Sequence, residues 1–317
     1  MEWTPDRLLP GYECYSFEIP LAVTAIGEPD DPLTSTIIRR NPTTSRRAVM
    51  YLHGWNDYFF QTHLADFFAA RGFDFYAVEL RRYGRNLREG LLGGYITDLD
   101  EYSHELDVAY DIIAADHDEV TLMGHSTGGL VGALWADGRA GDLSGVILNS
   151  PWLDLQGSPL LRTVTTPIIS RLSDSYPTTV IPLPDNGFYQ RTISASEDGE
   201  WTYDVSLKRN PSFVIRMGWL KAILHGHGRV AAGLSIDTPV LVLSSVRSDF
   251  RRRWNPALMS ADTVLDVDKI AHAAVGLGHH VTMVRIEDGL HDLVLSRPDV
   301  RQVVFDEMGR WLGAYVE

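Results

Sequence analysis

A serine in this sequence has the neighbours that make a serine hydroxyl reactive. Residues 124–128 read Gly-His-Ser-Thr-Gly, after an apolar run at 120–123 and before a segment of helical character that extends to Trp135. A G-x-S-x-G between a strand and a helix predicts a tight turn that exposes the serine at the carboxyl end of the strand. The glycines lack the Cβ atoms that would clash there. We therefore predict that Ser126 is a nucleophile rather than part of an ordinary glycine-rich turn.

A serine nucleophile requires a histidine that takes its proton and a carboxylate that fixes the histidine tautomer. For this motif the expected order along the chain is serine, acid, histidine. His291 fits best, because it lies in the loop 287–292, directly after the last predicted strand. The acid should follow the preceding strand, where Asp249 and Asp262 are both candidates. Three arginines at 251–253 favour a surface ion pair as the alternative role of Asp249.

The negative charge that develops on a substrate carbonyl oxygen needs N–H donors that are already in place. One is expected from the backbone of Thr127, the residue after the nucleophile. The other is expected from the loop His53-Gly54-Trp55, where Trp55 presents its N–H. Tyr58, His125 and Trp152 lie beside these loops in the sequence and are predicted to bind substrate, with a purely structural role in the core as the alternative.

Composition limits the class of protein. The 317 residues are 44% hydrophobic, which suits one large domain or one domain with an insertion. The absence of any apolar run of 18 residues predicts that no helix spans a membrane. The net charge of −14 disfavours nucleic acid and anionic membranes as partners. With no secretory signal at the start and a single cysteine, Cys14, we expect a cytoplasmic protein without disulfides.

Strands and helices should alternate along most of the chain. Apolar runs that predict strands occur at 48–52, 73–80, 120–123, 145–148, 239–243 and 281–286, with an edge hairpin from 14–19 and 33–40. Helices are expected at 58–71, from about 98, after Ser126 and at 298–316. This alternation favours a mostly parallel sheet with helices on both faces.

The alternation stops between about 154 and 236. An apolar stripe at 160, 161, 164, 168 and 172 predicts one helix, and Asn210-Pro211 resembles the start of another that runs through Leu224 and ends at Gly226. We therefore predict a core formed by 1–153 and 237–317, and an inserted, mainly helical cap formed by 154–236 that lies over the site.

The motifs together resemble those of the serine α/β-hydrolases of the monoacylglycerol lipase and lysophospholipase group. The matching segments, spread over most of the chain, are HGW at 53–55, ELRRYGRN at 79–86, GHSTGG at 124–129, NSPW at 149–152, DTVLD at 262–266 and GLHDL at 289–293. The resemblance implies the α/β-hydrolase fold and makes Asp262 the triad acid, because the family acid begins a D-x-[VI]-[VL]-[DS] segment. Two departures are Arg82, where glycine is typical, and the dozen residues before Asp262, which keep Asp249 as second choice.

The resemblance implies a serine carboxylester hydrolase that cleaves neutral monoesters, such as monoacylglycerols, lysophospholipids or aryl and alkyl esters, through an acyl-enzyme on Ser126. No cofactor or metal is implied, and the expected partner is a small-molecule ester. A peptidase or amidase on the same fold is the alternative, and acidic cap residues such as Glu197, Asp198 and Glu200 would then invite a role in binding an ammonium group. A non-catalytic ligand receptor would not need the complete serine, acid and histidine set. The sequence does not indicate an oligomeric state.

Overall fold

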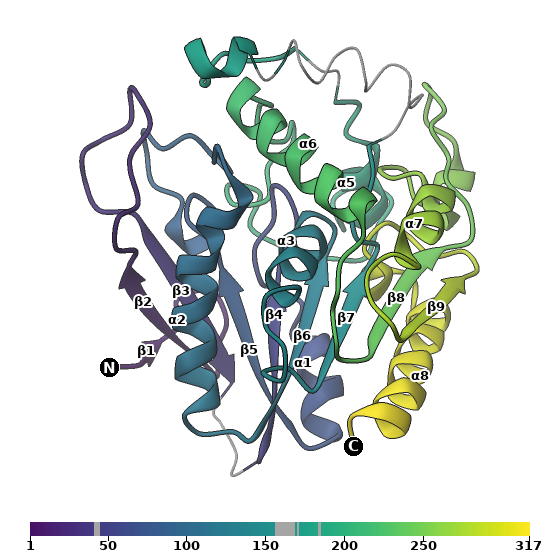
Figure 1. Ribbon diagram of the computed structural model, residues 1–317. Helices are drawn as coiled ribbons and strands as arrows, with labels where there is room; N and C mark the ends of the chain where they lie inside the picture. Colours follow the sequence, from purple (N-terminus) through teal and green to yellow (C-terminus); the bar gives the residue numbers. More distant parts are fainter. Residues whose placement is uncertain (41–44, 156–168, 170, 183–184) are drawn as a thin grey trace.

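The structure, a computed structural model, describes residues 1–40, 45–155, 169, 171–182 and 185–317. Its centre is a nine-stranded sheet in the order β1-β2-β3-β5-β4-β6-β7-β8-β9 (Figure 1). The strands are β1 Thr4–Pro5, β2 Tyr12–Glu18, β3 Thr34–Arg40, β4 Arg47–Leu52, β5 Phe73–Glu79, β6 Glu119–His125, β7 Gly145–Asn149, β8 Val240–Ser245 and β9 Val281–Ile286. The predicted strands and edge hairpin are therefore present.

The strands from β5 to β9 run parallel, whereas β1, β2 and β3 are antiparallel to their neighbours. Four central strands, β4, β6, β7 and β8, are almost wholly buried, which explains why each reads as a continuous apolar run. After β4 the chain adds β5 on one side and then β6 on the other. This reversal opens a crevice at the carboxyl ends of β4 and β6, where open α/β sheets bind their ligands.

Helices cover both faces of the sheet. The helices that lie wholly within the described residues are α1 Thr62–Ala70, α2 Ser103–Ala114, α3 Thr127–Ala136, α5 Phe188–Ile193, α6 Met217–Ala232, α7 Val267–Ala274 and α8 Pro298–Tyr315. Short 3-10 turns lie at η1 Gly84–Asn86, η2 Leu99–Tyr102, η3 Pro256–Ser260 and η4 Leu293–Leu295. One hydrophobic core joins α2, α3, α6 and α7 to the sheet, and a second joins α1 and α8 to its other face. This is the α/β-hydrolase fold that the resemblance implied.

The segment between β7 and β8 contributes no strand to the sheet within the described residues. It holds α5 and α6, which lie above the carboxyl ends of the central strands (Figure 1). Most of the predicted stripe from 160 to 172 lies outside the described residues. Whether 154–236 forms a separate unit stays a prediction.

The helix predicted from Asn210 to Leu224 is wrong at both ends. The observed helix α6 begins at Met217 and continues past Gly226 to Ala232. Gly226 does not end it, because the missing side chain serves packing: a Cβ there would lie 2.8 Å from Cδ1 of Leu99. The preceding apolar residues 213–215 line a cavity instead of a helix face.

Arg82, which replaces the glycine typical of the family, has the left-handed backbone conformation that glycine adopts easily, with φ of 66°. Its buried guanidinium forms an ion pair with Glu28 and donates to the carbonyls of Tyr95 and Val23. These contacts offset the backbone strain and fasten the loop before β3 to the loop after η1.

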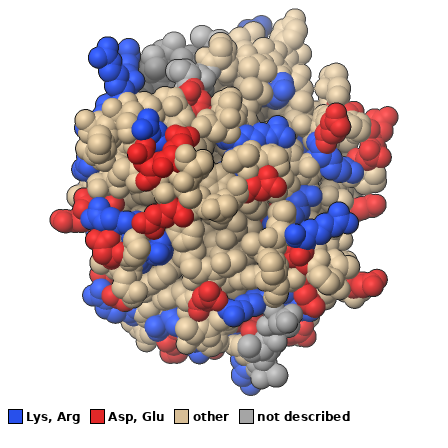
Figure 2. Space-filling model, turned by 180° about the vertical axis from the view of Figure 1, so that it is seen from behind, with Lys and Arg blue, Asp and Glu red and all other residues tan. Residues whose placement is uncertain are grey.

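The surface carries mixed charges. On the face in Figure 2, Lys and Arg side chains lie among Asp and Glu side chains. Exposed pairs such as Arg40 with Asp66 and Arg310 with Glu307 show the same mixing. No described helix is long and apolar enough to cross a membrane.

Candidate active site

Ser126 lies at the turn between β6 and α3. Its backbone is in a strained conformation, with φ of 53° and ψ of −116°. The turn is held because its N–H donates to the carbonyl of Asn149 at 3.0 Å and its carbonyl accepts from the N–H of Trp152 at 3.0 Å. A Cβ on Gly124 would lie 2.6 Å from the carbonyl oxygen of Gly128, so the close approach of strand and helix requires the glycine.

His291 connects the serine to an acid. Its Nε2 lies 2.9 Å from Oγ of Ser126, and its Nδ1 lies 2.9 Å from Oδ2 of Asp262. All three residues are buried, with exposed fractions of 6% for the serine, 3% for the histidine and 0% for the aspartate. With Nδ1–H donating to the carboxylate, Nε2 accepts the serine hydroxyl proton. This is the geometry in which an imidazole acts as a general base.

The structure brings Asp262, and not Asp249, to the histidine. The other Asp262 oxygen, Oδ1, accepts from the N–H groups of Val264 and Leu265, each at 2.8 Å, so the carboxylate cannot rotate freely. Asp249 instead forms an ion pair with Arg251. The two segments are nevertheless neighbours, because the N–H of Asp249 donates to the carbonyl of Asp262. The residues between Asp249 and Asp262 therefore form a loop whose two ends lie side by side.

Hydrogen bonds from neighbouring side chains hold the loop that carries His291. Asp292 is fully buried; its Oδ1 accepts from Nδ2 of Asn149 at 2.7 Å, and its Oδ2 accepts from Nε2 of Gln61 at 3.4 Å. Burial raises the pKa of this carboxyl group. The N–H of Leu290 donates to Oγ of Ser296, which closes the other side of the loop. The histidine is therefore held by side chains from β7 and from the turn before α1.

Two backbone N–H groups near Ser126 have no acceptor among the described residues. Within the described residues, neither Trp55 nor Thr127 donates its backbone N–H to another group of the chain. His53 shapes the first of these loops: its Nδ1 donates to the carbonyl of Gly54 at 2.8 Å, and its Nε2 accepts from the N–H of Leu80 at 3.2 Å. Burial lowers the pKa of His53, so it stays neutral in this role. Both residues predicted to donate to the oxyanion thus line the same cavity as Ser126.

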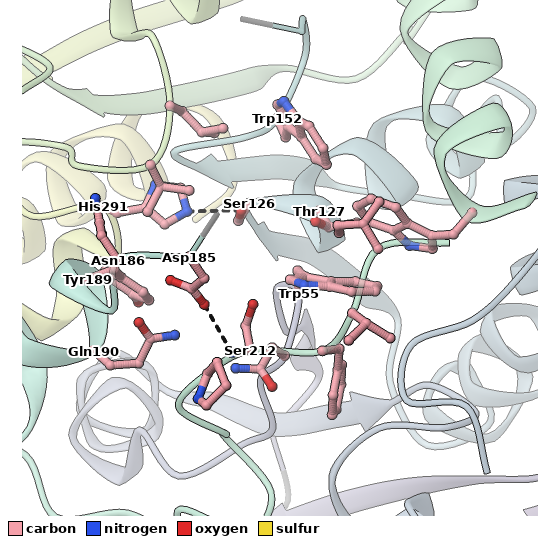
Figure 3. A pocket seen from close by; sticks show the side chains of 18 of the residues that line it. Trp55, Ser126, Thr127, Trp152, Asp185, Asn186, Tyr189, Gln190, Ser212 and His291 are labelled. Atoms are coloured by element: carbon pink, nitrogen blue, oxygen red, sulfur yellow. Dashed lines mark hydrogen bonds between the residues drawn. The ribbon is translucent and has the colours of Figure 1, made fainter. Parts of the chain in front are cut away.

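A cavity of about 600 Å³ opens over Ser126 and His291. Aromatic side chains form one wall, where the Trp55 and Trp219 rings lie 4.1 Å apart and the Trp55 and Phe213 rings 5.6 Å apart. Polar side chains form the opposite wall, and Figure 3 shows Asp185, Asn186, Tyr189 and Gln190 on that side. The cavity can therefore hold a molecule with an apolar and a polar end next to the serine.

Of the three predicted substrate-binding residues, His125 and Trp152 line this cavity and Tyr58 does not. The prediction for Tyr58 is wrong because its side chain is buried beneath the loop, where its hydroxyl accepts from the N–H of Asp204 at 2.7 Å. The acidic residues considered for an ammonium site do not line the cavity either. They pair with arginines: Glu197 and Asp198 with Arg191, and Glu200 with Arg301.

A buried polar cluster lies next to Ser126 and His291. Nδ1 of His125 is 3.8 Å from Oδ2 of Asp57 and 4.0 Å from Oδ2 of Asp292. Within the described residues this is the one group of three side chains spaced to hold a metal ion. A cation is already there, because Nζ of Lys208 lies 2.9 Å from the other oxygen of Asp57. Burial lowers the pKa of His125 well below its ordinary value, so this histidine stays neutral.

Several residues of the site had no sequence signal that we recognised. Lys208, Phe213 and Trp219 come from the segment between β7 and β8, where no motif marks the residues that face the cavity. Asn149 and Asp292 lie inside motifs that were recognised, yet their contact with each other depends on the neighbouring positions of β7 and the histidine loop.

Comparison with known proteins gives one family and one fold. A family model described as serine aminopeptidase S33 matches residues 43–250. No curated protein matches the chain in sequence. A soluble variant of monoglyceride lipase from Saccharomyces cerevisiae, in complex with a substrate analog, is similar in structure, with a TM-score of 0.64, 15% identity, and coverage of 95% of this chain and 98% of that one.

Two further solved structures resemble the chain over nearly its whole length. Monoacylglycerol lipase from Paleococcus ferrophilus has a TM-score of 0.60 and 14% identity, with coverage of 99% of this chain and 100% of that one. Est1E from Butyrivibrio proteoclasticus, with ferulic acid bound, has a TM-score of 0.56 and 12% identity, with coverage of 92% and 99%. At these identities the structures support the fold.

Proposed function

Because the chain belongs to the serine aminopeptidase S33 family of α/β-hydrolases, we propose that it is a serine carboxylester hydrolase that cleaves neutral monoesters through an acyl-enzyme on Ser126. The observation that carries the proposal is the unbroken chain of hydrogen bonds from Ser126 through His291 to Asp262. A receptor without catalytic activity would have no need of this arrangement.

The reaction follows from the positions of the groups. Oγ of Ser126 attacks the ester carbonyl while its proton passes to Nε2 of His291, and Asp262 stabilises the imidazolium. The carbonyl electron pair moves to oxygen, where the N–H groups of Trp55 and Thr127 hold it. The histidine gives its proton to the leaving alcohol oxygen as the C–O bond breaks. Water then attacks the acyl-enzyme by the same route and releases the acid.

The cavity supports a substrate with one apolar and one polar end. The aromatic wall of Trp55, Phe213 and Trp219 suits a medium acyl chain or an aromatic acyl group, and the polar wall suits the alcohol. The structurally similar proteins include two monoacylglycerol lipases, one of them in complex with a substrate analog, and Est1E, which binds the aromatic ferulic acid. The segment 154–236 acts in this proposal as a cap that covers the acyl chain.

Two measurements test the proposal. Ser126→Ala should lose nearly all esterase activity and all labelling by a fluorophosphonate, while its thermal unfolding stays close to that of the unchanged protein. Across acetyl to palmitoyl esters of one alcohol, kcat/KM should rise with acyl length until the cavity is full, since each buried methylene contributes up to about 0.8 kcal/mol. Activity that survives in Ser126→Ala would refute the mechanism, and a flat profile would refute the acyl cavity.

A peptidase is the second candidate, and one observation favours it. Asp185 is the single carboxylate among the described residues that line the cavity, and Figure 3 shows it across from Ser126 and His291. A carboxylate there suits the ammonium group of an aminoacyl substrate. If so, Asp185→Asn should raise KM for aminoacyl p-nitroanilides more than KM for neutral esters. Absence of any anilide hydrolysis by the unchanged protein would exclude this candidate.

A further inference from the structure

The loop that continues from Trp55 is bound to the segment between β7 and β8. Nδ2 of Asn56 donates to the carbonyl of Arg209 at 2.8 Å, and Oδ1 of Asn56 accepts from the N–H of Arg209 at 3.2 Å. The hydroxyl of Tyr58 accepts from the N–H of Asp204 at 2.7 Å. Residues on both sides of position 57 are thus held by residues 204–209, which we call the anchor segment.

A buried ion pair lies between these two contacts. Nζ of Lys208 is 2.9 Å from Oδ1 of Asp57, and the side chains are 2% and 0% exposed. Among the described residues the second oxygen of Asp57 has no hydrogen-bond partner, and it faces His125, which is neutral because burial lowers its pKa. Lys208 is therefore the cation that compensates the buried carboxylate. Removal of one partner of such a pair leaves the other charge without compensation.

The backbone is strained directly after the Trp55 donor. Asn56 has a left-handed backbone, with φ of 52°, a conformation that a non-glycine residue keeps only when its surroundings hold it. It directly follows Trp55, whose N–H must point at the substrate oxygen. A misplacement of about 1 Å in a catalytic group can cost about 10²-fold in rate. The contacts of the anchor segment therefore bear on the position of this donor.

We propose that Lys208 is a positioning residue, which holds Asp57 and thereby fixes the Trp55 N–H in the oxyanion hole. This inference rests on the proposed function and adds to it a dependence of catalysis on the anchor segment. Lys208 takes no part in the proton transfers of Ser126 and His291. Its effect is on the donor that stabilises charge in the transition state, so it should change kcat more than KM.

The test compares an ester with the matching thionoester. Sulfur accepts hydrogen bonds more weakly than oxygen, so the thionoester gains less from an oxyanion hole. Lys208→Met should lower kcat for the ester by about tenfold or more, part of the 10²- to 10³-fold that one donor contributes. KM should stay within about threefold, and the ratio of ester to thionoester rates should fall. Lys208→Arg keeps the charge and should recover part of the rate.

A double variant separates positioning from stability. Lys208→Met together with Asp57→Asn removes both charges, so its thermal midpoint should return toward that of the unchanged protein while the rate ratio stays low. Lys221→Met, which breaks the partly exposed pair of Lys221 with Asp174 in the same inserted segment, is the matched control and should leave the ratio unchanged.

The outcomes distinguish this inference from the proposed function. An unchanged protein that neither hydrolyses esters nor reacts with a fluorophosphonate would refute the proposed function. If the unchanged protein is active, a normal rate ratio in Lys208→Met would overturn the positioning role alone. If that variant does not fold, the double variant decides, and recovery of its kcat would mean that Lys208 only compensates the charge of Asp57.

Discussion

Replacement of Asp262 by asparagine tests the triad most sharply, because the structure dictates how the new amide must lie. Oδ1 of Asp262 accepts two backbone N–H groups, from Val264 and Leu265, at 2.8 Å each. If the side-chain nitrogen of the asparagine took the place of Oδ1, it would face these two N–H groups with no acceptor among them. The side-chain oxygen must therefore take the place of Oδ1. The amide nitrogen then faces Nδ1 of His291 at the site of the present 2.9 Å bond. Nδ1 becomes the acceptor, and the proton moves to Nε2, where it blocks transfer from Ser126.

The expected loss in kcat for Asp262→Asn is about 10⁴, the value for this tautomer error in serine proteases, or about 5 kcal/mol in the activation barrier. Initial rates on an ester with a chromogenic alcohol measure it, and circular dichroism shows that the protein is folded. Asp249→Asn is the matched control: because Asp249 pairs with Arg251 near the surface, we expect a change within about twofold. An Asp262→Asn variant that keeps a tenth of the activity, or a crippled Asp249→Asn, would refute the assignment of the acid.

Three further predictions concern stability. Burial lowers the pKa of His63 to about 4, so the unfolded chain binds more protons than the folded protein between pH 6.5 and 4. Through this group the free energy of unfolding should fall by about 2 kcal/mol from pH 8 to pH 5. Urea unfolding of His63→Gln should show a smaller fall than the unchanged protein. Gly228→Ala should raise the free energy of unfolding by up to about 1 kcal/mol, because a Cβ there meets no other atom within 4 Å. For Gly226→Ala the Cβ would clash with core leucines, so its free energy of unfolding should be at least about 1 kcal/mol below that of Gly228→Ala. Glu28→Gln should lower the free energy of unfolding by about 3–5 kcal/mol, because it leaves the buried charge of Arg82 without its partner. The double variant with Arg82→Gly should recover part of that free energy. Losses that simply add in the double variant would contradict the pairing.

The core of the fold was predictable because its signals are local. Strands such as β6 and β7 are buried on both faces, so their apolar runs have no other explanation in a chain of this composition. The turn at Ser126 was equally visible, since a Cβ on Gly124 would clash with the backbone of Gly128 and a Cβ on Gly128 would clash with that of His53. The resemblance to the family, carried by such motifs, is confirmed at the level of family and fold.

The start of α1 shows where local signals fail. The pattern predicts a helix from Tyr58, but the helix begins at Thr62. Residues before it make tertiary contacts instead: the Tyr58 hydroxyl accepts from the N–H of Asp204, and the N–H of Phe59 donates to the buried carboxylate of Glu79 at 2.9 Å. Tertiary contacts therefore replace the first helical turn, and they come from parts of the chain that no local pattern connects.

The segment between β7 and β8 was the least predictable for a physical reason. A helix face and a cavity wall have the same apolar composition, because both exclude water on one side. Residues 213–215 read as the first turn of a helix, yet Phe213 packs on Trp55 and the next two residues line the cavity. What distinguishes the two cases is the surface opposite, here the aromatic wall that Trp55 contributes from the loop after β4. The cavity over Ser126 is thus specified jointly by two segments some 150 residues apart. This explains why local motifs predict the candidate catalytic groups but not the shape of the substrate.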